Sequence, residues 1–219
     1  LRAHTVYSQI EPDQPGTDAR TVSFCFPEDL AAMKADIAAA KELAETVIVS
    51  MHWGVHMKEE VIAHYQREAA YAAIDAGAAA IIGHHAHILK GVEFYRGAPI
   101  FYSLGNFALE QPHVWDPAIV ETDSFRHLLS LNPGVSKDKG YMLPYDTRYT
   151  GVVRLGIEAG KVVRTEFLPA FIGDDTVPRM VGQGDEKFGE IQRYLERISR
   201  AEGMSTKFSP EGDVLVLTT

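Results

Sequence analysis

The pattern of apolar and polar residues predicts strands and helices that alternate along the first part of the chain. Short apolar runs rich in β-branched residues predict strands at residues 5–9, 20–26, 46–53 and 78–83. Apolar residues at helical spacing predict helices at residues 28–45 and 59–76, and Gly77 follows the second one, as expected at a helix end. The run at 46–53 is continuously apolar, which is typical of a strand covered on both faces. A series of strand, helix, strand, helix and strand builds a parallel or mixed sheet with helices on its faces.

The second part of the chain reads as hairpins and a long irregular segment. Residues 91–107 predict two strands joined at Arg96 and Gly97, and residues 150–171 predict a hairpin that turns at Ala159 and Gly160. Residues 108–148 between them are aromatic, acidic and irregular, and loops of this length often form lids or contact substrates. A helix at residues 186–201 and a strand at 213–217 complete the prediction.

Composition narrows the class of protein. The chain has 219 residues, of which 46% are hydrophobic and 23% charged, as in ordinary globular proteins. Its net charge is −9, and the basic residues are scattered among the acidic ones, so we expect no nucleic-acid partner. The single cysteine, Cys25, excludes an internal disulfide and a cysteine metal cage, and we expect it to be a buried thiol. No apolar run reaches the length of a membrane-spanning helix, so we expect no membrane segment in this chain.

Histidines stand directly after two of the apolar runs. His52 follows one run in VSMHWG, and His85 and His87 lie in GHHAH after the next. Neighbouring strands of such a sheet end at a common edge, so His52 should lie near the other two. His85 and His87 point the same way in an extended segment, whereas His84 points away and is not expected to be a ligand. Imidazoles bind divalent Zn, Mn or Fe together with carboxylates, so the pattern predicts a metal site; hydrogen-bonded structural histidines are the alternative.

Two stretches carry a resemblance to a known family: VIVSMHWG and YAAIDAGAAAIIGHHAHILKGVEFYRGAPIFYSLGNF. Over roughly residues 46–107 the chain resembles the bacterial capsule synthesis CapA family, which is associated with poly-γ-glutamate synthesis. The resemblance implies an α/β fold class, a layered sandwich of sheets and helices like that of calcineurin-like metallophosphoesterases. It implies that residues 1–170 are part of this domain and that residues 171–219 form a helix-strand extension.

The same resemblance implies roles for individual residues. His52, His85 and His87 match metal ligands of the family. Asn106, in the motif SLGNF, matches a position near the site and is assigned a structural or substrate-contacting role; a left-handed turn residue is the alternative. His56 follows the HWG motif closely enough to act as a catalytic acid or base, and a surface histidine at the entry to a helix is the alternative.

The chain also departs from the family pattern. The family's aspartate-x-histidine, glycine-aspartate and glycine-asparagine-histidine motifs, which supply carboxylates that bridge two metals, do not occur in this sequence. Asp13, Asp18, Asp29 and Asp36 fit none of them. We therefore expect this chain to be the C-terminal half of its domain, with the missing N-terminal half as its partner and the carboxylate ligands upstream of Leu1. Three neutral imidazoles leave the charge of two divalent cations uncompensated, so this segment alone should bind metal weakly.

With carboxylates supplied, the resemblance implies an enzyme with a dinuclear centre of divalent metal ions; Mn, Fe, Zn, Mg and Ca are not distinguished. Such a centre supports hydrolysis, or acid-base chemistry next to a carbonyl group. The acidic and aromatic segment at residues 108–148 favours peptide-like or cationic substrates over polyphosphates, and a solvated loop is the alternative. The resemblance implies a peptide or poly-γ-glutamate-type substrate. A peptide epimerase, a phosphoesterase and a non-catalytic component of capsule or exopolymer assembly are the alternatives.

Overall fold

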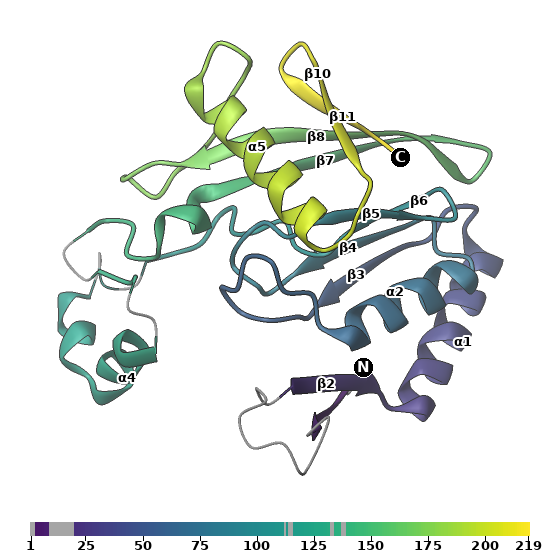
Figure 1. The fold of residues 1–219 in the computed structure, drawn as a ribbon, viewed down its shortest axis with the longest axis horizontal. Helices are drawn as coiled ribbons and strands as arrows, with labels where there is room; N and C mark the ends of the chain where they lie inside the picture. The colour runs from purple at the N-terminus through teal and green to yellow at the C-terminus, as the bar shows by residue number, and fades with distance from the viewer. Residues whose placement is uncertain (1–2, 9–19, 112, 114–115, 132–133, 137–138) are drawn as a thin grey trace.

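The computed structural model describes residues 3–8, 20–111, 113, 116–131, 134–136 and 139–219 (Figure 1). Its strands are β1 (Ala3–Ser8), β2 (Arg20–Cys25), β3 (Ile48–His52), β4 (Ala80–His84), β5 (Val92–Tyr95), β6 (Ala98–Phe101), β7 (Tyr149–Glu158), β8 (Lys161–Ile172), β9 (Pro178–Met180), β10 (Lys207–Glu211) and β11 (Val214–Thr218). Its helices are α1 (Pro27–Leu43), α2 (His64–Asp75), α4 (Asp123–Leu131) and α5 (Glu186–Ala201), with 3-10 helices η1 (Pro117–Glu121) and η2 (Tyr145–Arg148). None of the described helices is long and apolar enough to cross a membrane.

A central sheet with the strand order β3-β4-β6-β5 positions the histidines. Strands β3, β4 and β6 run parallel, and β5 pairs antiparallel with β6. One face packs against α1 and α2 in a core that includes Ile81, Ile100 and Tyr102 (Figure 1). The parallel strands and their covering helices confirm the layered α/β architecture expected from the alternating pattern.

A second, antiparallel sheet has the order β10-β11-β8-β7, with β9 paired to β8. The β7–β8 hairpin turns at Ala159 and Gly160, whose φ angles of 47° and 74° are those of a two-residue hairpin turn. Helix α5 shares one core with both sheets, through Phe101, Phe167 and Ile191 among others. The boundary expected at residue 170 falls inside β8. The division into residues 1–170 and 171–219 stays a prediction.

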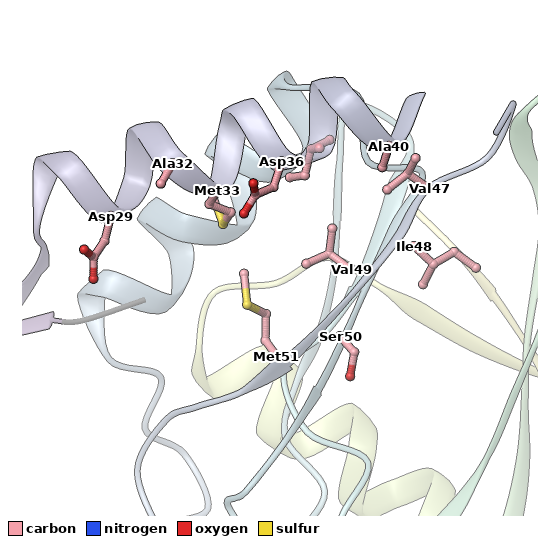
Figure 2. A pocket seen from close by; sticks show the side chains of 11 residues that line it. Asp29, Ala32, Met33, Asp36, Ala40, Val47, Ile48, Val49, Ser50 and Met51 are labelled. Carbon is pink, nitrogen blue, oxygen red and sulfur yellow. The ribbon is translucent and has the colours of Figure 1, made fainter. Parts of the chain in front are cut away.

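Strand β3 differs from the expectation of a strand covered on both faces. Val49 and Met51 pack toward α1, but Ile48 on the opposite face is 46% exposed. No described strand pairs with the outer edge of β3. Between α1 and β3 lies a groove of about 610 Å³ that is bounded by Met33, Val49 and Met51 (Figure 2). Among the described residues, therefore, helix packing covers only one face of β3, and the continuous apolar run does not correspond to a strand covered on both faces.

Two further elements depart from the sequence prediction. Helix α2 begins at His64 rather than at Glu59, and the residues before it form a loop. The segment 108–148, expected to be irregular, contains α4 and a small apolar cluster built on Phe125, Val135 and Met142. Phe125 and Leu129 stand four residues apart on one face of α4, which gives this short helix an apolar side to bury.

Candidate functional site

The candidate site lies where β3 and β4 end side by side. These strands pair in parallel with His52 opposite His84, so both side chains leave the sheet at the same edge. His85 and His87 follow immediately, with φ angles of 99° and 59°. Such left-handed angles are uncommon for residues with side chains, and they cluster at functional sites. The segment is therefore turned rather than extended, which changes how its histidines point.

The imidazoles of His52, His84 and His85 form one hydrogen-bonded group. Nε2 of His52 lies 2.9 Å from Nδ1 of His85, and Nδ1 of His52 lies 3.1 Å from Nδ1 of His84. Nε2 of His84 in turn lies 3.0 Å from the Ser50 hydroxyl oxygen. The expectation that His84 points away is wrong, because the left-handed conformation at His85 lets consecutive side chains approach the same neighbour.

His56 and His87 extend this group. Their ring centroids lie 5.0 Å apart with the rings nearly perpendicular, and His56 lies 5.9 Å from His85. The centroids of His85 and His87 are 6.4 Å apart, and those of His52 and His85 are 4.6 Å apart. The structure thus brings together all three histidines predicted as ligands and the histidine predicted as an acid or base. We call His52, His56, His84, His85 and His87 the histidine cluster.

Asn106 fixes the orientation of the His87 ring. Its Oδ1 lies 2.6 Å from Nδ1 of His87, while its Nδ2 donates to the backbone carbonyls of His87 and Thr147. Because the amide nitrogen faces carbonyl groups, the amide oxygen is the acceptor, and Nδ1 of His87 must carry the hydrogen. Nε2 is then the ring nitrogen of His87 that remains for another partner.

The alternative for Asn106, a left-handed turn residue, is wrong. Gly105 takes the positive φ angle of 73° at this turn, and Asn106 is 6% exposed. Nδ2 of Asn106 also donates to the Tyr141 hydroxyl at 2.9 Å, and that hydroxyl donates to the Thr147 carbonyl. The turn is therefore present, but Gly105 adopts the left-handed conformation in it. The Asn106 side chain makes hydrogen bonds instead.

Burial and the neighbouring imidazoles disfavour the charged form of three members of the cluster. Burial lowers the pKa of His85, and neighbouring His52, His87 and His84 lower it further. The pKa of His84 is lowered by burial and by His52. Burial, followed by His87 and His85, lowers the pKa of His56. Neutral imidazole is the form that binds metal ions or accepts a proton.

The histidine cluster offers the imidazole ligands of a metal centre but not the carboxylate ligands. Imidazole side chains converge, and the hydrogen on Nδ1 of His87 leaves its Nε2 as the nitrogen that a metal ligand uses. Within the described part of the chain, however, no group of three or more His, Cys, Asp or Glu side chains could hold a metal ion by itself. Asp29 and Asp36 lie on α1 and line the groove shown in Figure 2, whereas Asp13 and Asp18 lie outside the described residues. A carboxylate contribution would have to come from elsewhere.

Sequence reasoning missed several residues that support the cluster. Ser50 stands two residues before His52 on β3, so the two-residue period of a strand could have identified it. Tyr141 and Thr147 are separated from Asn106 by 35 and 41 residues, respectively. No local pattern in the sequence could have indicated those two contacts.

Comparison with known proteins identifies related sequences. The family model described as "Bacterial capsule synthesis protein PGA_cap" matches residues 2–111. The chain is 47% identical over 75 residues to "PGA biosynthesis protein CapA" of Bacillus subtilis, a match covering 34% of this chain and 20% of that protein. It is 43% identical over 68 residues to "Capsule biosynthesis protein CapA" of Bacillus anthracis, a match covering 31% of this chain and 16% of that protein.

A longer match links the chain to "Probable polyglutamine synthesis accessory protein" of Mycobacterium tuberculosis. Here 38% of 177 residues are identical, which covers 81% of this chain and 40% of that protein. The chain thus spans less than half the length of each of these relatives. The family match confirms the resemblance drawn from VSMHWG and GHHAH, and with the layered sheets and helices it confirms the metallophosphoesterase-like fold class.

Proposed function

Because this chain belongs to the bacterial capsule synthesis protein PGA_cap family, we propose that it forms part of a metal-dependent enzyme acting on a peptide or poly-γ-glutamate-type substrate. The observation that carries this proposal is the convergence of imidazole side chains at the ends of β3 and β4. The name of the Bacillus subtilis relative, a biosynthesis protein for PGA, supports the class of substrate.

In this proposal His52, His85 and His87 hold divalent metal ions. Asn106 orients His87 so that its Nε2 lone pair points away from the Asn106 amide. Carboxylates from a part of the full-length protein outside this sequence complete the ligand set and offset the charge of the cations. When bound, two divalent ions lower the pKa of a coordinated water and polarise a carbonyl oxygen.

His56 is the proposed acid-base residue. Its ring lies against His87 at the edge of the cluster, on the loop between β3 and α2. Its lowered pKa leaves it unprotonated at neutral pH, so it can accept a proton from a group bound over His87. This role serves hydrolysis and equally serves proton abstraction next to a carbonyl group.

Metal analysis of the full-length protein tests the proposal. We expect the double variant H85A/H87A to lose bound divalent metal, measured by mass spectrometry of the dialysed protein, and to lose turnover of γ-linked glutamyl peptides. The exposed His127 on α4 gives a matched control, since H127A should keep both properties. If the double variant keeps its metal, the ligand assignment is wrong.

The product of the reaction separates the remaining possibilities. Shortened γ-linked peptides indicate hydrolysis, and deuterium uptake from solvent at a Cα atom without cleavage indicates epimerisation. Release of inorganic phosphate from phosphate esters, with no action on peptides, would replace the proposed substrate class. Unchanged polymer production in cells carrying H85A/H87A would instead indicate a non-catalytic assembly role.

A further inference from the structure

Lys90 is a buried cation that the proposed chemistry does not use. It is 2% exposed, which is rare for lysine unless its ammonium group is fully paired. Its Nζ donates to the backbone carbonyl of Lys58, to that of Val61 at 3.0 Å and to that of Glu59 at 3.4 Å. The three donors of one ammonium group are therefore matched by three carbonyl groups of a single loop.

Two of these carbonyl groups, those of Glu59 and Val61, belong to residues that the sequence assigns to a helix. Apolar periodicity predicts a helix from Glu59, yet α2 begins at His64. In a helix the carbonyls of residues 58–61 would accept bonds from amides four residues further along, but here several of them face Lys90. The ammonium group thus competes with helix formation for the same acceptors.

The loop is also held from its outer side and from the histidine segment. Arg197 of α5 pairs with Glu59 at 2.7 Å and with Glu60. The amide of Met57 donates to the carbonyl of Ala86 at 3.0 Å, between His85 and His87. His56 therefore lies next to a residue tied to the histidine segment and shortly before the carbonyl groups held by Lys90.

We propose that Lys90 is a positioning residue whose ammonium group holds residues 58–61 out of helix α2 and thereby keeps His56 against His87 and His85. Without it, the four residues have freedom to extend α2 or to sample other conformations, and His56 loses its fixed place. The chemical use of this placement rests on the proposed function, whereas the conformational effect does not.

The charge state of Lys90 agrees with this geometry. Burial lowers its pKa to about 8, and Glu202, Glu59 and Asp146 act in the opposite direction. The ammonium form therefore predominates at pH 7, where it supplies three donors. Glu202 also accepts a bond from the amide of Ile62 at 3.1 Å, which fixes the end of the same loop.

Hydrogen exchange of the full-length, metal-free protein tests the effect on the loop. In K90M, which keeps most of the length of the side chain but removes its donors, peptides covering residues 55–62 should exchange at least about tenfold faster. Peptides from β4 and β6 should be unchanged. The matched control is K41M, because Lys41 is an exposed lysine on α1 that also contacts a backbone carbonyl. Unchanged exchange of the loop in K90M would overturn the proposal.

Rescue by a small cation separates positioning from general stability. In K90A, ethylammonium chloride should restore slow exchange of residues 55–62 and the NMR contact between the His56 and His87 rings. Tetramethylammonium chloride, which has no N–H donors, should not. Equal effects of the two salts would contradict the proposal. Should K90A unfold, K90Q can replace it, because glutamine keeps amide donors at this position, and the loop should then exchange at an intermediate rate. Exchange at the wild-type rate in K90M would contradict the proposal. Faster exchange over the whole of K90Q, rather than in the loop alone, would also contradict the proposal.

These measurements need neither metal nor turnover, so their outcome is independent of the test of function. A loop released in K90M together with a protein that never binds metal would support the role of Lys90 and reject the proposed enzyme. A loop unaffected in K90M together with metal loss in H85A/H87A would reject the role of Lys90 and support the proposed enzyme.

Discussion

The two faces of β3 show how one short strand serves packing and chemistry at once. Val49 and Met51 face α1 across the groove of Figure 2, where apolar contacts have no required direction. Ser50 and His52 alternate with them and face the other side, where ring nitrogens have identifiable partners. The first face tolerates changes of shape, whereas the second depends on the orientation of individual atoms.

The largest effect that this comparison predicts is at Asn106, away from both faces but in contact with His87. N106A removes the acceptor that fixes the His87 tautomer, so Mn²⁺ affinity of the full-length protein should fall about 10- to 100-fold. Isothermal titration calorimetry measures this. Y141F, which removes only a hydroxyl bonded to Asn106, should have a smaller effect. Unchanged affinity in N106A would show that orientation of the ring is unimportant.

A smaller effect is expected on the packing face of β3. M51A should lower the free energy of unfolding by about 1–2 kcal/mol, less than for a fully buried position, because Met51 is only partly buried. Urea denaturation measures the loss, and Mn²⁺ affinity should stay within about twofold of wild type. A parallel loss of metal affinity would mean that the two faces are not independent.

The pH dependence of stability distinguishes charge from apolar packing. The folded pKa of Lys90, about 8, lies below the usual 10.5, so the unfolded chain binds more protons between these values. Stability contributed by this group therefore rises with pH in that range, by about 1 kcal/mol between pH 8 and pH 9. Urea midpoints should show this rise in wild type relative to K90M, and M51A should keep it. Identical pH slopes in wild type and K90M would show that the Lys90 pKa is not depressed.

The smallest effect is expected at Ile48, which lies on the same face as Ser50 and His52 but is 46% exposed. I48S in this 219-residue chain should change the free energy of unfolding by less than about 0.5 kcal/mol. Urea denaturation at neutral pH checks it. A loss as large as that of M51A would show that this face of β3 is covered in solution.

Much of the fold could be predicted from local pattern. The helix at residues 186–201 was predicted with the bounds of α5, and the structure shows that the Asp185 side chain caps its first turn. The hairpin turn at Ala159 and Gly160 followed from turn chemistry. The start of α2 could not be predicted, because the residues before His64 have a helical pattern in the sequence. In the structure their carbonyl groups accept hydrogen bonds from Lys90, which lies far away in the chain.

The sequence predicted most of the histidines of the candidate site, but it did not predict how their side chains are arranged. His52, His85 and His87 were identified from strand ends and family motifs, and the structure brings them together. The left-handed angles at His85 and His87 could not be predicted from the sequence, because histidine adopts positive φ angles only in a minority of cases, although more often than most residues. For this reason the inclusion of His84 in the cluster was missed.

The most direct test of the central claim is a crystal structure of the full-length protein grown with Mn²⁺, with anomalous diffraction recorded at the manganese edge. We expect anomalous peaks within bonding distance of the His52, His85 and His87 imidazoles, with Nδ1 of His87 still bonded to Asn106. Peaks located elsewhere, with His52 and His85 still hydrogen-bonded to each other, would contradict the claim.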